Sequence, residues 1–70
     1  MVNSNKIKGL IKTAGMTQAE CARKIGISAQ SLNAKINGKT EFNSEEIVAF
    51  RDLFDLGGQV ESIFFANRVD

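Results

Sequence analysis

Apolar residues recur along this chain with the period of an α-helix. In the first such segment they are spaced at i, i+3, i+4 and i+7 and form one face: Ile7, Leu10, Ile11 and Ala14. This face predicts a helix over residues 5–14, which Gly15 ends. No stretch alternates apolar and polar residues as a half-buried β-strand would, and proline is absent. The prediction for the chain is therefore all-α.

Residues 17–38 predict two further helices separated by one glycine. Thr17 is a cap residue, and Glu20 follows at the spacing of a capping box. Gly26 ends this helix where a left-handed backbone costs little. The next helix has a cap, one apolar stripe and a closing glycine: Ser28, Leu32, Ile36 and Gly38. Two helices that cross steeply around a glycine turn form the helix-turn-helix of DNA-binding proteins.

Two more helices are predicted in the second half of the chain. The fourth begins at Asn43 or Ser44, and Asn43 and Glu46 have capping-box spacing. Its buried face is expected to be Ile47, Phe50, Leu53 and Phe54. A glycine pair breaks the helix, and a short fifth helix is indicated by Val60, Ile63 and Phe64.

The expected core draws on all five helices. We expect nine residues to be buried together: Leu10, Ala22, Ile25, Ile27, Leu32, Ile47, Phe50, Leu53 and Ile63. Cys21 falls where the second helix faces the first, so we expect a small core residue there, with a reactive thiol as the alternative.

Size and composition restrict the function. At 70 residues the chain is expected to form a single domain over residues 1–70, too small for a separate catalytic or sensing domain. It has no histidine and one cysteine, so no metal site, cofactor or enzymatic activity is expected. No apolar run of membrane-spanning length and no secretory signal is present, which favours a cytoplasmic protein.

The net charge of +1 hides a strong polarity along the chain. Residues 1–40 carry seven lysines and arginines against Glu20 alone, a net charge of +6. Residues 41–70 carry two arginines against seven acidic residues, a net charge of −5. A basic half that holds the motif suits docking on phosphate, although such charges can also be an ordinary solvated surface.

Within residues 17–39 the chain carries a signature: Gln18, Ala22, Gly26, Ile27 and Leu32, followed by Asn37, Gly38 and Lys39. In this signature the chain resembles the Cro and CI repressor type of helix-turn-helix, the XRE-like family. The resemblance implies a compact five-helix, lambda-repressor-like domain with the helix-turn-helix on helices 2 and 3. The ending, residues 63–70, resembles short Cro-like regulators from temperate phages of Gram-positive bacteria.

One position departs from the family pattern. The family has an apolar residue three positions after Leu32, where this chain has Lys35, and the apolar residue is Ile36 instead. Either the third helix is rolled on the core, or Lys35 passes along the edge of the core toward solvent. The assignment of base-reading residues can therefore move by about one residue along the third helix, which has 3.6 residues per turn.

The outer face of the third helix is the expected base-reading surface. Opposite the Leu32–Ile36 stripe, helix geometry places Gln30, Ala34 and Asn37, with Asn33 on one flank and Ala29 in the first turn. Amides can bond the N6 and N7 edge of adenine, and an alanine methyl can contact the thymine methyl. The resemblance implies base contacts at Ser28, Ala29, Gln30 and Ala34. The alternative for Gln30 and Asn33 is an ordinary solvated helix face.

Phosphate contacts are expected at the ends of the two helices. Gln18 begins the second helix, where backbone and side-chain amides can meet a phosphate. After the third helix, the next phosphate can be held by Asn37, Gly38, Lys39 and Thr40. Lys12, Arg23 and Lys24 are weaker candidates.

These observations predict a sequence-specific binder of double-stranded DNA, a Cro-like repressor that occupies a palindromic promoter operator as a homodimer. Because Phe64 and Phe65 are adjacent, one can face the core while the other contacts a partner subunit. The alternative for the phenylalanines is that all five fill the core. The alternative function is an antirepressor or adaptor that binds another regulator through the acidic half. No membrane and no small-molecule ligand is expected as a partner.

Overall fold

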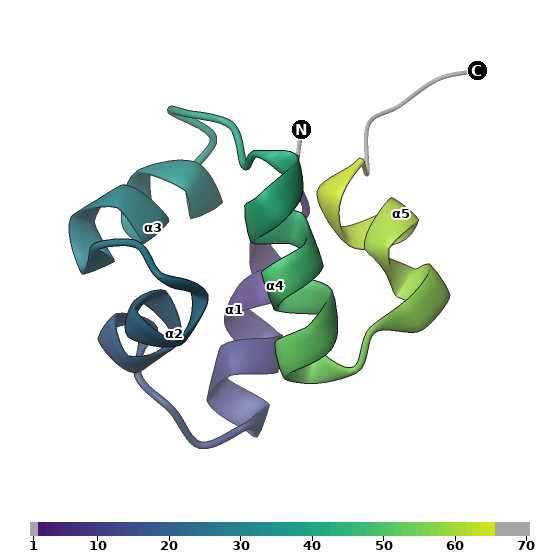
Figure 1. Ribbon diagram of the computed structural model, residues 1–70, viewed down its shortest axis with the longest axis horizontal. Helices are drawn as coiled ribbons and strands as arrows, with labels where there is room; N and C mark the ends of the chain where they lie inside the picture. Colours follow the sequence, from purple (N-terminus) through teal and green to yellow (C-terminus); the bar gives the residue numbers. More distant parts are fainter. Residues whose placement is uncertain (1, 66–70) are drawn as a thin grey trace.

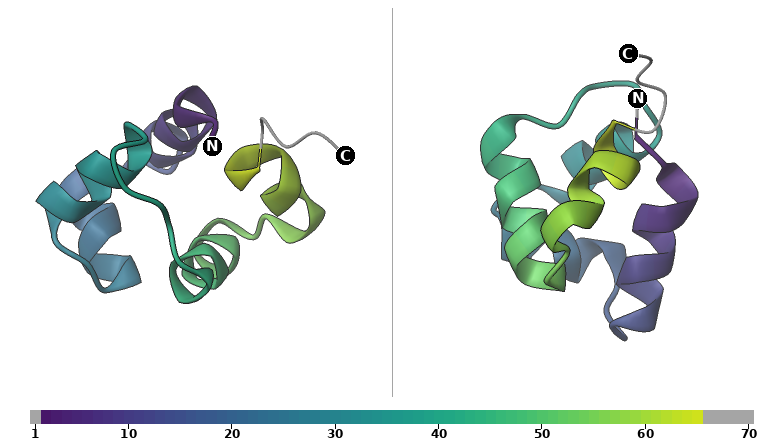
Figure 2. Two further views of the ribbon diagram at one scale, coloured as in Figure 1. Left: turned by 90° about the horizontal axis from the view of Figure 1, so that it is seen from above. Right: turned by 90° about the vertical axis from the view of Figure 1, so that its right-hand side faces the viewer.

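The computed structural model describes residues 2–65 and contains five α-helices within that range. These are α1 (Ser4–Thr13), α2 (Gln18–Ile25), α3 (Ala29–Ile36), α4 (Ser44–Phe54) and α5 (Val60–Phe64), with a 3₁₀ turn η1 (Gly57–Gln59) before α5. In Figure 1, α2 and α3 lie on one side, α1 and α4 in the middle and α5 on the other. The left view of Figure 2 shows the same order from above, and in the right view, seen from the side of α5, α4 and α1 lie on either side of α5. The all-α, five-helix prediction is confirmed.

The four longer helices each begin after a capping residue, and those of α2, α3 and α4 are the predicted ones. Side-chain oxygens of Asn3, Thr17, Ser28 and Asn43 each accept a hydrogen bond from the backbone N–H three residues later. Thr17 and Asn43 form complete capping boxes, because Glu20 and Glu46 accept the N–H of their own cap residue in return. Each such cap satisfies donors that a helix start would otherwise leave unpaired.

The same four helices end in one type of turn. The residue after each helix's last turn has a positive φ: Gly15, Gly26, Gly38 and Asp55. In each case the following N–H donates to a carbonyl five residues earlier, for example from Ile27 to Ala22 and from Lys39 to Ala34. These turns set the directions in which successive helices leave one another.

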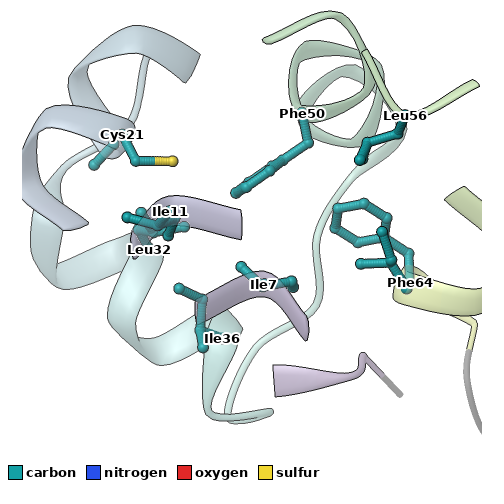
Figure 3. Packing of buried hydrophobic residues seen from close by; sticks show 10 residues of the cluster. Ile7, Ile11, Cys21, Leu32, Ile36, Phe50, Leu56 and Phe64 are labelled. Carbon is teal, nitrogen blue, oxygen red and sulfur yellow. The ribbon is translucent and has the colours of Figure 1, made fainter. Parts of the chain in front are cut away.

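The core collects residues from every α-helix (Figure 3). Buried side chains are Ile7, Ile11, Cys21, Ala22, Leu32, Ile36, Phe50, Leu56, Ile63 and Phe64. Of the nine residues expected to be buried, four are; the other five are partly buried and pack against this cluster: Leu10, Ile25, Ile27, Ile47 and Leu53. Cys21 is fully buried, as predicted, and its desolvation raises the pKa of the thiol to about 11.

One expectation about the core was wrong, and one core residue was not predicted. Ala14 does not complete the apolar face of α1, because the helix ends at Thr13 and the turn at Gly15 leaves Ala14 exposed. Leu56, which no helical pattern indicated, is 4% exposed. The left-handed Asp55 turns the chain after α4, and Leu56 then joins the buried cluster that includes Phe50 of α4 (Figure 3).

The last helix closes the fold against the start of the chain. The N–H of Asn3 donates to the carbonyl of Ile63 at 2.7 Å. Phe42, Phe50 and Phe64 pack edge to face, and Phe54 stacks on Phe50. Residues 66–70, which belong to the ending that resembles phage regulators, lie outside the described residues. Within residues 2–65, no helix is long and apolar enough to cross a bilayer.

Candidate DNA interface

α2 and α3 form the helix-turn-helix unit, and α3 presents its outer side to solvent (Figure 1). Ala22, which is 1% exposed, lies in α2, and Gly26 makes the turn with a φ of 88°. Leu32 and Ile36 are both fully buried, so the predicted inward stripe of α3 is the observed one. The opposite side of α3 faces away from this buried stripe, and most of its residues are exposed.

The predicted base-reading residues gather on this outer side. Ala29, Gln30 and Asn33 are exposed, whereas Ala34 is half-buried. Ser28 is exposed, but its hydroxyl accepts the N–H of Ser31 as the cap of α3. The surface is short and uncharged, and its longer polar side chains are amides.

A hydrogen bond that sequence reasoning missed joins the two helices at this surface. Nε2 of Gln18 donates to Oδ1 of Asn33 at 3.1 Å. Gln18 is the first residue of α2 and Asn33 lies in the middle of α3. The bond uses one of the two lone pairs of the Asn33 oxygen, and both amide N–H groups of Asn33 stay available as donors. Fifteen residues separate the pair, so no local spacing indicated it.

The segment after α3 is fixed in shape and lies at the surface. Asn37, Gly38, Lys39 and Thr40 are all exposed. Gly38 has a φ of 80°, and the N–H of Lys39 donates to the carbonyl of Ala34 at 2.9 Å. The weaker phosphate candidates, Lys12, Arg23 and Lys24, are also exposed.

Neither of the two alternatives for Lys35, a rolled third helix or a side chain that runs out to solvent, is observed. Its amine pairs with the carboxylate of Glu46 in the first turn of α4, and the side chains are 13% and 9% exposed. α3 is not rolled, because Leu32 and Ile36 keep the inward face. The lysine is accommodated because an acidic residue meets it at the edge of the core.

The two adjacent phenylalanines face different ways. Phe64 is 3% exposed and packs against Phe42 and Phe50. Phe65 is 37% exposed and borders a pocket of about 320 Å³ that is also lined by Val2, Thr40 and Phe42. Of the two candidates for a subunit contact, only Phe65 offers surface to a partner.

Comparison with known proteins gives one match. A family model described as Helix-turn-helix matches residues 7–58, which run from within α1 through α4 and into η1. None of the curated proteins and none of the solved structures matches the chain.

Proposed function

Because this chain belongs to the XRE-like helix-turn-helix family, which includes the Cro and CI repressors, we propose that it is a Cro-like repressor that occupies a promoter operator. Sequence-specific DNA binding through the motif follows from the family, and repression is what we propose beyond it. A bound domain blocks transcription sterically when its site overlaps the promoter. The observation that carries the proposal is the uncharged, amide-bearing outer face of α3, which lies between the start of α2 and the exposed segment of residues 37–40.

In this proposal α3 enters the major groove with its N-terminal part. Gln30 offers a donor and an acceptor and so can bond both N6 and N7 of adenine. Asn33, whose oxygen already accepts one hydrogen bond from Gln18, can donate from its amide N–H groups to acceptors such as guanine O6 or N7. The methyls of Ala29 and Ala34 contact thymine methyls, and the Ser28 hydroxyl bonds a neighbouring base or phosphate.

Phosphates on either side of the groove hold the motif in register. Gln18 stands at the N-terminus of α2, where free backbone N–H groups favour an anion. The segment Asn37–Thr40 contacts the next phosphate, with Lys39 supplying the charge. Such contacts add affinity on any sequence and make binding sensitive to salt.

We further propose that two copies bind a palindromic operator. A two-fold dimer places its α3 helices about one duplex turn apart, roughly 34 Å, and doubles the recognised sequence. Phe65 lies near the axis in this arrangement, supported by its exposure and by the pocket beside it. Phe64 is a core residue and contributes only by fixing the backbone of α5.

An adaptor or antirepressor is the second candidate, favoured by one observation. Val48 is 43% exposed on α4, on the helix that also carries the exposed acids Glu45 and Asp52. A protein partner with a basic, apolar surface would fit this face.

Selection from random duplex DNA tests the proposal, followed by titration of the enriched duplex across a salt series. We expect enrichment of a palindrome with half-sites about one turn apart, and affinity that falls steeply with salt. Failure to enrich any sequence, together with binding to another regulator that is insensitive to salt, would establish the adaptor reading instead.

A further inference from the structure

An ion pair ties the end of α3 to the start of α4 across the loop of residues 37–43. Lys35 is in the last turn of α3, and Glu46 is in the first turn of α4. Their charged groups are in direct contact and largely withdrawn from solvent. In Figure 1 this loop crosses from α3 to α4 at the same end of the molecule as the last turn of α3.

The two oxygens of the Glu46 carboxylate serve both sides of this loop. Oε2 accepts from Nζ of Lys35, before the loop, and Oε1 accepts from the N–H of Asn43, its last residue, at 2.9 Å. Asn43 in turn caps α4 by accepting the N–H of Glu46 at 2.8 Å. One side chain thus fixes the last turn of α3 and the last residue of the loop.

A third contact holds the beginning of the loop. The Ser4 hydroxyl donates to the carbonyl of Ile36, so the first residues of α1 close the free end of α3. The loop of residues 37–43, which contains Asn37–Thr40, is therefore held where it leaves α3 and where it reaches α4. Its own Lys39–Ala34 backbone bond gives it one turn in between.

The physical chemistry of a withdrawn ion pair favours a positional role over a stabilising one. The free-energy cost of removing two charges from water is about as large as the gain from their attraction, and proteins with apolar residues in place of the pair are often as stable. An apolar residue at position 35 would fill the edge of the core but would not hold the loop at a defined point. The directional bonds of Glu46 do so.

We propose that the Lys35–Glu46 pair positions the segment Asn37–Thr40 for phosphate contact, so that Glu46, although acidic, increases affinity for DNA. This inference rests on the proposed function, in which that segment contacts phosphate. Glu46 and Lys35 act as positioning residues: Glu46 is buried and its partner is 13% exposed, so neither presents a free charge to the duplex.

Two matched variants give opposite expectations, Glu46→Gln and Glu45→Gln. Both remove one negative charge from the first turn of α4, which by simple electrostatics tightens binding to a polyanion. Glutamine at position 46 still accepts the Asn43 N–H in a capping box, so this change removes the ion pair alone. Glu45 is exposed and serves as the control.

We expect Glu46→Gln to bind both the selected and a scrambled duplex about tenfold more weakly, a change that corresponds to about 1.4 kcal/mol. The magnitude of its salt slope should fall by about one unit for one lost phosphate contact. Glu45→Gln should bind as tightly as the parent chain or slightly more tightly. Urea unfolding of each variant ensures that only folded protein is compared, so lower stability alone cannot produce the loss.

The result that overturns the inference is Glu46→Gln binding DNA as Glu45→Gln does. If Glu46→Gln is not folded, the double variant Lys35→Met/Glu46→Gln replaces it, since it keeps the net charge and leaves no unpaired charge; parent-like affinity in that variant overturns the inference. If the parent chain binds no duplex, the proposed function fails separately. In that case hydrogen exchange of the Lys39 backbone N–H, which is bonded to the Ala34 carbonyl, tests the inference without DNA. We expect faster exchange in Glu46→Gln than in Glu45→Gln, and equal exchange overturns the inference.

Discussion

Truncation of Leu32 tests whether the inward face of the recognition helix supports the whole domain. The Leu32 side chain is fully buried in the cluster that includes Ile7, Cys21 and Phe50. Leu32→Ala removes buried carbon atoms and leaves a cavity, a change that costs about 2–5 kcal/mol in comparable sites. A 70-residue domain has roughly 4–10 kcal/mol of total stability, so the loss is a large share of it.

The measurement is urea unfolding followed by circular dichroism, with a thermal melt beside it. At about 4–8 °C per kcal/mol for a domain of this size, the melting temperature of Leu32→Ala should fall by at least about 8 °C. Val48→Ala is the control, because Val48 is 43% exposed and its truncation should change stability by no more than about 0.5 kcal/mol. A loss below about 1 kcal/mol in Leu32→Ala, or equal losses in both variants, would refute the burial of this face.

Three further expectations concern assembly, the thiol and acid. Phe65→Ser should weaken the proposed dimer in sedimentation without changing the melting temperature of the protomer, and an unchanged dimer would remove Phe65 from the interface. Burial raises the pKa of the Cys21 thiol from 9.0 to about 11, so the folded chain should carry about a hundredfold less thiolate than the unfolded chain. The thiol should therefore react slowly with a maleimide until denaturant is added. A fast reaction of the folded chain would contradict this expectation. Hydrogen bonds from Thr17 hold the pKa of the Glu20 carboxyl below 4.5 in the folded chain. The ionised carboxylate therefore stabilises the fold above pH 4.5, and this stabilisation is lost as the pH falls through the pKa of the folded state. Glu20→Gln should lose less stability than the parent chain on acidification, and an identical dependence of stability on pH would count against the capping box.

The local elements could be predicted because their signals lie within a few residues of one another. Thr17 with Glu20 and Asn43 with Glu46 are capping boxes that sequence spacing alone identifies, and the structure has both. Gly26 likewise marked the turn between α2 and α3, where it has a φ of 88°. The order of the helices and the inward face of α3 followed from these signals and from apolar spacing.

Contacts between side chains distant in the sequence could not be predicted in this way. Glu46 was expected only as a partner of Asn43, yet it also meets Lys35 from eleven residues away. Gln18 was expected to contact phosphate, and its bond to Asn33 depends on how α2 and α3 cross. Two amides that face each other across a helix pair are visible only once the crossing geometry is known. The assignment of bases and phosphates to particular side chains remains a prediction.

The most direct test of sequence-specific reading compares Gln30→Ala with Lys39→Ala on the selected and the scrambled duplex across a salt series. An amide can match one base edge, whereas an ammonium offers only donors and charge. We predict that Gln30→Ala weakens binding to the selected duplex by about 1–3 kcal/mol and leaves the scrambled duplex nearly unaffected. Lys39→Ala should weaken both alike and reduce the magnitude of the salt slope by about one unit. Equal loss on both duplexes in Gln30→Ala would contradict the assignment of α3 as the base-reading helix in this register.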